Sequence, residues 1–374
     1  MKQFYPLSAF LTEYSEKNDG NKYRPVAVGR YGIRPRESIY SKELAKDYSK
    51  NKLIHKNTLT VGMGSVQIDI GILTEDITYS VSPAYHTYRI TGIDATYLRY
   101  CLECRNQDMF ARFVKRGSRQ GKTIDLKRWL TYEIPVYDMV RQAEIVDRLD
   151  RILGLIEKRK EQLLQLDQLV KSRFIELFGD PVGNPKGWTM VPLGTRCEII
   201  TGNTPSRAEA KNYGEFIEWI KSDNINTPYT FLTEAQEYLS EIGFQKCRFV
   251  EAGSLLMTCI AGSVNCIGNV AVADRRVAFN QQINAIVPNE DEVLYLYWLM
   301  LLSKPAIHRA INMALKGILS KRQLSEMMFP FPPVALQKQF VTFVEQTDKS
   351  KLAIQESLKR LEILKKSLMQ KYFG

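Results

Sequence analysis

"KSRFIELFG" (171–179) and "KSLMQKYFG" (366–374) are two similar stretches that both end in Phe-Gly, and their residue numbers differ by 195. The same offset holds upstream of both stretches. Positions that match at it are Pro135 with Pro330, Gln142 with Gln337, Val146 with Val341, Glu161 with Glu356, and Leu163, Leu166 and Leu169 with Leu358, Leu361 and Leu364. Two unrelated helices rich in Leu and Lys would not share aligned Pro and Gln upstream. Self-similarity at a long period therefore predicts a chain built from two copies of one unit.

Each copy begins just before a Pro-Leu pair and ends in a long helix. Pro6-Leu7 opens the first copy and Pro192-Leu193 opens the second. The two are joined by "GDPVGNPKGW" (179–188), whose Gly, Pro and Asn are typical of a helix end and a linker. Between the openings and the helices lie short β-rich runs mixed with helical segments. We therefore expect four segments, two α/β bodies and two helices, in the order 1–135, 136–180, 181–330 and 331–374.

The two bodies share a fold but have diverged in sequence. "TVGMGSV" (60–66) and "TCIAGSV" (258–264) align at an offset of 198, close to that of the helices. Elsewhere the bodies differ strongly. This pattern is expected if the helices perform one task twice while the bodies perform different tasks.

Both long helices carry a heptad-like apolar seam. The apolar residues recur at spacings of three, four or seven, and Lys and Glu fill the other faces. A lone seam needs a partner, and within this chain each helix has only the other. At about 1.5 Å per residue, such a helix spans roughly 55 Å. The seam residues are Leu149, Ile152, Ile156, Leu163, Leu166 and Val170 in the first helix, and Ile354, Leu358, Leu361 and Leu368 in the second, where Thr347, Lys351 and Lys365 interrupt it.

Composition narrows the class of protein. With 374 residues, of which 44% are hydrophobic, the chain can bury cores for two or more domains. A net charge of +11 fits a partner that carries phosphates, although a membrane surface or simple solubility would also explain it. The longest apolar run, "VLYLYWLMLL" (293–302), is too short to cross a bilayer, so we expect a cytoplasmic protein. Six cysteines and three histidines offer neither a disulfide framework nor a metal site, and none is expected.

The sequence contains no recognisable catalytic motif. A phosphate-binding G-x-x-x-x-G-K-[ST] loop is absent. A DNA methyltransferase would need Asn or Asp before Pro-Pro and an aromatic residue, but Phe331 precedes Pro332-Pro333. The three histidines are scattered. We therefore expect no catalytic residue in this chain.

Several motifs together resemble one known family over essentially the whole chain. "VPLG" opens the second unit, "GNTPSR" (202–207) follows, "FPFPPVALQKQFV" (329–341) enters the last helix and "KSLMQKYFG" closes it. This order is similar to that of the specificity subunit of type I restriction-modification systems. "GNTPSRAEAKNYGEFIEWIKSDNI" (202–225) and "SVSPAYHTYRI" (80–90) resemble stretches of that family's target recognition domains. The first half departs from the pattern, with "PVYDMVRQ" (135–142) where the second has "FPPVALQ" (331–337).

The resemblance implies an α+β fold with an internal pseudo-twofold repeat. Two tandem α/β target recognition domains would be separated by two long antiparallel coiled-coil helices. It also implies a non-catalytic DNA-binding subunit, in which each domain recognises one half of a bipartite, asymmetric target in double-stranded DNA. Half-sites on one face of B-DNA lie about 34 to 36 Å apart or at multiples of that distance, which suits domains at the ends of a rod.

The resemblance further implies partners for this chain. The helices would set the spacer and dock two modification (methyltransferase) subunits, and restriction subunits with translocase and endonuclease activity would join them. S-adenosylmethionine, ATP and magnesium are then expected on those partners, with no cofactor on this chain. The alternative is a coiled-coil scaffold protein without sequence-specific DNA binding.

Candidate DNA contacts follow from side-chain chemistry. Arg and Lys pair with guanine, Asn and Gln pair with adenine, and Lys, Arg, Ser and Thr also bind phosphates. Such residues cluster in turn-rich loops of both bodies. In the first body they are Arg30, Arg34, Arg36, Ser65, Gln67, Lys115, Arg116, Arg119 and Lys122. In the second body they are Thr201, Asn203, Thr204, Arg207, Lys211, Lys221, Ser222, Asn224 and Ser263.

Overall fold

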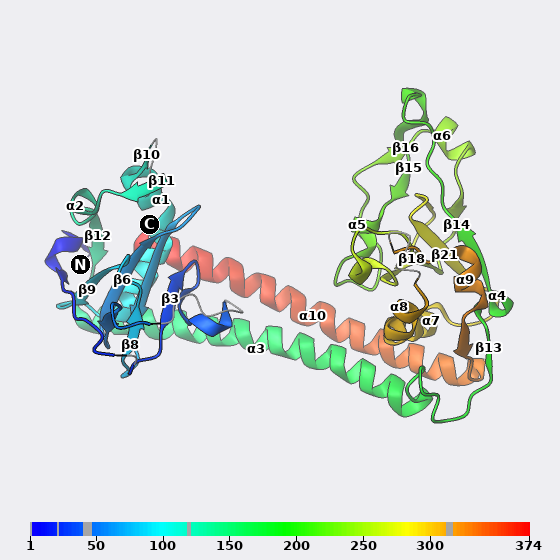
Figure 1. Ribbon diagram of the computed structural model, residues 1–374, viewed down its shortest axis with the longest axis horizontal. Coiled ribbons are helices and arrows are strands. Elements are labelled where there is room, and N and C mark those ends of the chain that lie inside the picture. The colour runs from blue at the N-terminus through cyan, green and yellow to red at the C-terminus, as the bar shows by residue number, and fades with distance from the viewer. Residues whose placement is uncertain (1, 21, 40–46, 118–120, 312–316) are drawn as a thin grey trace. The chain divides into compact units, whose positions relative to one another are not determined.

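The computed structural model describes residues 2–20, 22–39, 47–117, 121–311 and 317–374 (Figure 1). The chain divides into two compact units. Unit 1 comprises Met1–Lys160 and Glu356–Gly374, and unit 2 comprises Glu161–Gln355. Each unit therefore contains part of both long helices. Among the described residues, no helix is both long and apolar enough to cross a membrane.

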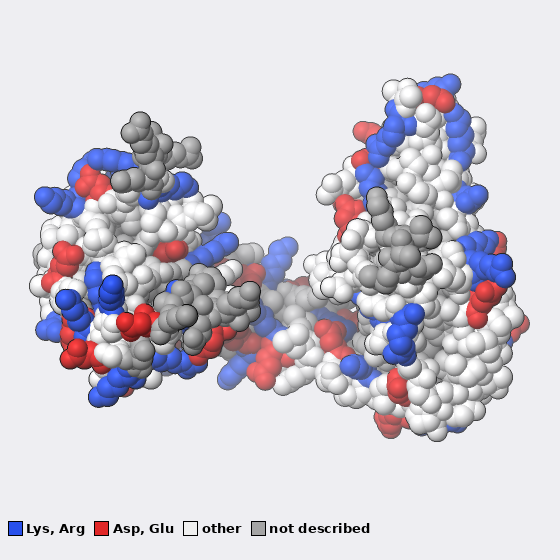
Figure 2. Space-filling model, in the orientation of Figure 1, with Lys and Arg blue, Asp and Glu red and all other residues white. Residues whose placement is uncertain are grey.

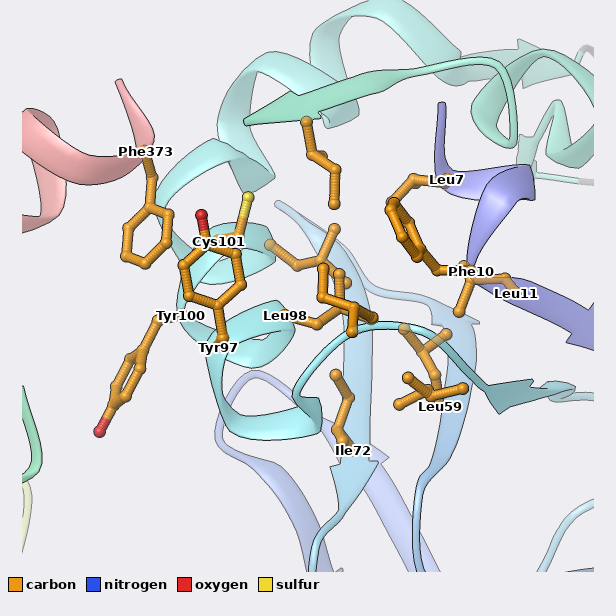
Figure 3. Packing of buried hydrophobic residues seen from close by; sticks show 14 of the residues in the cluster. Leu7, Phe10, Leu11, Leu59, Ile72, Tyr97, Leu98, Tyr100, Cys101 and Phe373 are labelled. Carbon is orange, nitrogen blue, oxygen red and sulfur yellow. The ribbon is translucent and has the colours of Figure 1, made fainter. Parts of the chain in front are cut away.

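Unit 1 is built on a four-stranded antiparallel sheet covered by one helix. The strands, in spatial order, are β2 (Leu11–Glu13), β9 (His86–Ile90), β6 (Thr58–Met63) and β7 (Ile68–Leu73). Helix α1 (Ala95–Phe113) begins where the Asp94 carboxylate accepts a hydrogen bond from the Tyr97 backbone N–H at 2.8 Å. Figure 3 shows Leu98 and Cys101 of α1 among the core side chains that also include Leu59 and Ile72 of the sheet.

Short strand pairs and helical turns complete unit 1. The strand pairs are β1 (Gln3–Pro6) with β12 (Glu133–Val136), β3 (Val26–Gly29) with β4 (Gly32–Pro35), β5 (Lys52–Ile54) with β8 (Tyr79–Val81), and β10 (Val114–Gly117) with β11 (Gly121–Ile124). The helical turns are η1 (Leu7–Ala9), η2 (Arg36–Ser38) and α2 (Leu126–Trp129).

Unit 2 contains a sheet with the same strand order and adds a second sheet. The first sheet is β14 (Cys197–Thr201), β21 (Ile283–Pro288), β18 (Ser254–Thr258) and β19 (Val270–Ala273). The second is β16 (Tyr238–Leu239), β15 (Tyr213–Ile220), β20 (Val277–Phe279) and β17 (Phe249–Val250). β13 (Met190–Pro192) pairs with β22 (Met328–Pro330).

Besides its parts of the two long helices, unit 2 contains short helices and helical turns. They are α4 (Leu193–Arg196), η3 (Ala210–Asn212), α5 (Ser222–Ile225), α6 (Glu241–Gln245), η4 (Val264–Cys266), α7 (Val293–Leu302), α8 (Lys304–Ala310) and α9 (Lys321–Glu326). Helix α7 is the apolar run 293–302 and lies in the core of unit 2.

The internal repeat predicted from the sequence is confirmed by the hydrogen-bonding pattern. The first sheet of each unit has the same spatial strand order, which is the first, fourth, second and third strand when the strands are counted along the chain. The entry into each unit also matches. Leu7 N donates to Tyr132 O at 3.0 Å, and Leu193 N donates to Met327 O at 2.9 Å. Tyr132 and Met327 are 195 positions apart, so the offset found in the helices also holds for these equivalent acceptors in the two bodies.

The long helices, α3 (Met139–Phe178) and α10 (Val334–Phe373), each have 40 residues. In unit 2 the Asp167 carboxylate lies 2.7 Å from Lys351 Nζ, and the rings of Phe174 and Phe340 are 5.4 Å apart. Contacts that advance along α3 therefore move backward along α10, so the helices are antiparallel within this unit.

In unit 1 the start of α3 and the end of α10 share one core. Ile145 and Leu149 of α3 belong to the same apolar cluster as Met369 and Phe373 of α10. None of the predicted seam residues is fully exposed. Leu149, Ile152, Ile156 and Val170 are buried, and Leu163, Leu166, Ile354, Leu358, Leu361 and Leu368 are half-buried.

Candidate functional site

In unit 1 the predicted DNA-contacting residues of three separate loops lie together. Arg30 sits at the tip of the β3–β4 hairpin, and its backbone oxygen accepts a hydrogen bond from Gln67 Nε2 at 3.5 Å. Ser65 lies in the same β6–β7 turn as Gln67, and its backbone oxygen accepts from Lys122 Nζ. Lys122 belongs to β11, so the β3–β4 hairpin, the β6–β7 turn and β11 form one surface. We call this surface the unit 1 loop cluster.

Arginine side chains of the unit 1 loop cluster stack on aromatic rings. The guanidinium carbons of Arg30 and Arg34 lie 5.8 and 5.0 Å from the centre of the Tyr31 ring. Arg36 lies 5.6 Å from the Tyr48 ring. Neither Arg30 nor Arg34 has a carboxylate partner among the residues that the structure describes. Their charge therefore remains available to an anionic partner.

The other basic candidates of unit 1 lie on the β10–β11 hairpin. Lys115 Nζ is 2.9 Å from the Asp125 carboxylate, and this hydrogen bond lowers the pKa of Asp125. The side chain of Arg116 and the whole of Arg119 lie outside the described residues. Lys115 is thus partly neutralised within the protein, in contrast to Arg30 and Arg34.

In unit 2 the predicted DNA-contacting residues Arg207 and Lys221 share one carboxylate partner and one aromatic ring. Arg207 and Lys221 both pair with Glu237, and the hydrogen bond from Lys221 lowers the pKa of that carboxyl. Both cations also lie over the Trp219 ring, at 5.1 and 5.3 Å. Arg207 further stacks on Tyr213 at 4.8 Å. This arrangement orients the two side chains, but it also offsets part of their charge.

The polar candidates after β14 bond to the protein itself. Asn203 Nδ2 donates to Lys246 O at 2.8 Å, and its Oδ1 accepts from Arg248 N at 2.8 Å. Thr201 Oγ1 donates to Asn284 Oδ1 at 2.7 Å, and Thr204 Oγ1 donates to Gln281. These bonds hold the 201–204 stretch against neighbouring loops, so it forms a fixed surface.

Asn224 caps a short helix. Its Oδ1 accepts from Lys221 N at 3.0 Å and its Nδ2 donates to Glu234 O at 3.0 Å, while the side chain is buried. The neighbouring Ser222 is half-buried. Of the remaining candidates, Ser263 is exposed before η4, and the exposed Lys211 lies 3.7 Å from Glu209.

Two basic residues lie beside this surface although sequence reasoning did not select them. Lys246 Nζ is 2.9 Å from the Glu209 carboxylate, and Arg248 Nη1 donates to Thr201 O at 2.5 Å. Both are exposed. On the face shown in Figure 2, Lys and Arg side chains flank the loop end of unit 2 where β15, β16 and α6 lie. In the sequence these two residues belong to the short basic stretch "KCR" (246–248), which matches no known motif.

Within the described residues, no group of three or more His, Cys, Asp or Glu side chains could hold a metal ion. The six cysteines are free. Burial raises the pKa of Cys101, Cys197 and Cys259 to about 12 each, so these thiols stay protonated at neutral pH.

Comparison with known protein families finds similarity to a DNA specificity domain. Residues 185–365 match the family model of the type I restriction modification DNA specificity domain. The specificity subunit of the HindI type I restriction enzyme of Haemophilus influenzae is 33% identical over 117 residues, which are 30% of this chain and 24% of that protein. The putative MjaX specificity subunit of Methanocaldococcus jannaschii is 20% identical over 300 residues, 74% of this chain and 67% of that protein. The alignment with the HindI subunit thus spans only about a quarter of its length.

Solved structures have the same fold along the whole chain. The S subunit of a type I restriction-modification system from M. genitalium covers 100% of this chain and 96% of its own, with a TM-score of 0.59 and 15% identity. A chain from a study of complex assembly and conformational transition of the type I R-M system covers 100% and 97%, with a TM-score of 0.60 and 17% identity. The predicted fold class, with its repeated α+β units and long helices, is therefore confirmed. In sequence, the chain is similar to the two specificity subunits named above.

Proposed function

We propose that this chain, which carries the DNA specificity domain of type I restriction-modification systems in residues 185–365, is the DNA recognition subunit of such a system. Segments 1–135 and 181–330 act as the two target recognition domains, and each recognises one half of a bipartite, asymmetric DNA sequence. The helices in 136–180 and 331–374 set the distance between the half-sites. The observation that carries the proposal is the internal repeat. The same arrangement of strands and helices occurs twice, about 195 positions apart, and its two copies carry different sets of polar loops.

The difference between the loops supports two different half-sites. In unit 1, Arg30 and Arg34 stack on one exposed tyrosine without a carboxylate partner among the described residues. In unit 2, Arg207 and Lys221 share Glu237 and lie against a second four-stranded sheet, which unit 1 lacks within its described part. Arg and Lys pair with guanine or phosphate, whereas a nearby carboxylate accepts from cytosine and repels phosphate. Each surface therefore suits a different sequence.

Exposed apolar side chains on the long helices support docking of partner subunits. In unit 1, Leu155 of α3 and Ile363 of α10 are exposed, and in unit 2 Leu164 and Leu352 are exposed. Their exposed fractions reach 70% at Leu164, which is high for leucine on a helix that already buries a seam. These four side chains are available for contact with another protein. Two methyltransferase subunits, one on the helix segments of each unit, would cover it.

The proposal assigns no chemistry to this chain. Its buried thiols Cys101 and Cys259 are protonated at neutral pH, and the ion pairs of Lys221 with Glu237 and of Arg275 with Glu218 hold loops in place. S-adenosylmethionine, ATP and magnesium would be bound by the modification and restriction subunits. This chain would position the DNA for them.

The test is co-expression with the neighbouring modification subunit, followed by single-molecule mapping of methylated bases in the host DNA. We expect a split, asymmetric motif with one methylated adenine in each half. Replacing residues 1–135 with another recognition domain should change one half of that motif and leave the other unchanged. A stable complex that leaves no motif would favour the scaffold alternative.

A further inference from the structure

The tip of the β3–β4 hairpin presents one aromatic ring to solvent. Gly29 pairs with Gly32 across the hairpin, so Arg30 and Tyr31 alone form the turn. Gly32 directly follows this turn and has φ +75°, a conformation that glycine adopts without strain. Tyr31 is 69% exposed, the highest value for a large apolar or aromatic side chain outside the two long helices among the described residues.

Two guanidinium groups lie within 6 Å of the centre of this ring. The guanidinium carbon of Arg34 lies 5.0 Å from the ring centre and that of Arg30 lies 5.8 Å away. Within the described part of the chain neither arginine pairs with a carboxylate, whereas Arg24, close to the same hairpin, pairs with Glu37. An aromatic ring with two available cations beside it combines a surface for stacking with two groups that bind phosphate.

Contacts with β7, Tyr85 and Gln67 hold the β3–β4 hairpin in position. An added Cβ at Gly71 of β7 would lie 2.6 Å from Ile33 Cγ1 and 3.0 Å from Val28 Cγ1, so the hairpin packs directly on that glycine. Tyr85 donates its hydroxyl to Val28 O at 3.0 Å. The Gln67 amide reaches Arg30 O at 3.5 Å. These contacts fix the hairpin tip before it binds a partner, so binding costs less conformational entropy.

We propose that Tyr31 stacks against a base at one step of the half-site recognised by unit 1, while Arg30 and Arg34 bind the phosphates on either side of that step. This inference rests on the proposed function. Side chains that insert at a base step partly unstack it, and pyrimidine–purine steps are the most easily unstacked. Tyr31 would then select a deformable step without a hydrogen bond to a base edge.

The experiment uses the chain in complex with its methyltransferase subunit. A target duplex is first selected from a pool of randomised duplexes, and affinity for it is measured at several salt concentrations. We expect Tyr31→Ala to bind this target about tenfold more weakly, with an unchanged salt dependence. Tyr31→Phe should bind as the unaltered chain does, since it keeps the ring. Arg34→Ala should weaken binding to all duplexes and reduce the salt slope by about one.

Phe4→Ala is the matched control. Phe4 is also an exposed ring with one cation over it, Lys2 at 5.6 Å, but it lies on β1 and outside the unit 1 loop cluster. This variant should bind DNA as the unaltered chain does. Permanganate reactivity of thymines in the bound target provides the second measurement. We expect one reactive step in the complexes of the unaltered chain and of Tyr31→Phe, and none in the Tyr31→Ala complex.

Failure of this inference can be separated from failure of the proposed function. If the unaltered complex selects a motif but Tyr31→Ala selects the same motif with the same affinity, the stacking role is wrong and the recognition function stands. Weaker binding without a reactive step in the unaltered complex would also overturn stacking. If the unaltered complex selects no motif, the proposed function fails and this inference fails with it.

Discussion

Gln142 and Gln337 make the same two hydrogen bonds in the two halves of the chain. Gln142 Oε1 accepts from Asp94 N at 2.9 Å and its Nε2 donates to Tyr137 O at 2.7 Å. Gln337 Oε1 accepts from Glu292 N at 3.0 Å and its Nε2 donates to Pro332 O at 3.0 Å. Both side chains are buried. Each amide therefore connects the start of a long helix to the residue that precedes α1 or α7.

Replacing either glutamine with leucine should destabilise its own unit. The substitution leaves a backbone N–H and a carbonyl buried without partners, at a cost of about 1–3 kcal/mol each. Gln337 also donates to Asp291 at 2.7 Å, so Gln337→Leu should cost more than Gln142→Leu. Urea denaturation measures both. Gln168→Leu, at an exposed position of α3, is the control, and equal losses in all three variants would contradict the structural role.

The stability of unit 2 should depend on the ionisation of Glu218. Hydrogen bonds from Arg275 lower the pKa of this carboxyl, and Ala235 N donates to it at 2.8 Å. A carboxyl whose pKa is lowered by folding contributes stability above its unfolded pKa, about 4.3, and loses it as pH falls through the folded value. We therefore expect the free energy of unfolding to fall below about pH 4.3, and to fall less steeply in Glu218→Gln. The same slope in both proteins would contradict this assignment.

Gly71→Ala should displace the β3–β4 hairpin. Its Cβ would meet Ile33 and Val28 inside normal contact distance, so the variant should lose about 1–3 kcal/mol of stability. Gly154→Ala is the matched control, because this glycine lies within α3 with no atom within 4 Å of an added Cβ. That variant should gain about 0.5–1 kcal/mol from helix propensity. Thermal unfolding distinguishes the two, and a stabilised Gly71→Ala would show that the hairpin does not pack there.

Shortening both long helices by one heptad should shorten the spacer between half-sites. Removing 158–164 from α3 and 352–358 from α10 deletes about 10 Å of helix, or about three base pairs of DNA. Methylation mapping of the co-expressed complex should then show the same two half-sites with a shorter gap. A change in the half-site sequences would contradict the separate roles of helices and domains.

The repeat and the helices could be predicted from the sequence because their signals are local or positional. Heptad spacing marks the seam, and Pro, Gln and Phe-Gly recur at one offset. The structure explains why these residues recur. Tyr97 and Tyr295 donate their hydroxyls to Pro135 O and Pro330 O, both at 2.8 Å. The tyrosines were not selected from the sequence; they align at the offset of 198 that relates 60–66 to 258–264, whereas the prolines they contact align at 195.

The predicted DNA contacts depend on information that the sequence alone does not contain. Residue type placed Arg30, Arg207 and Asn224 in one class of candidates. The tertiary structure separates them, because Arg30 keeps an available charge, Arg207 pairs with Glu237, and Asn224 is buried in a cap. The functional division of the chain at 135, 180 and 330 and every individual contact remain predictions.

By itself the sequence determined the duplication, the helix seams and the basic, polar character of the loops, because periodicity and residue type are carried by neighbouring positions. Only the tertiary structure decided which polar groups are satisfied within the protein and which face solvent. Their partners lie far along the chain, as Lys246 does from Asn203 and Gln67 does from Arg30. Hydrogen bonds and ion pairs act over a few ångströms, so folding alone determines which charges are left for a partner.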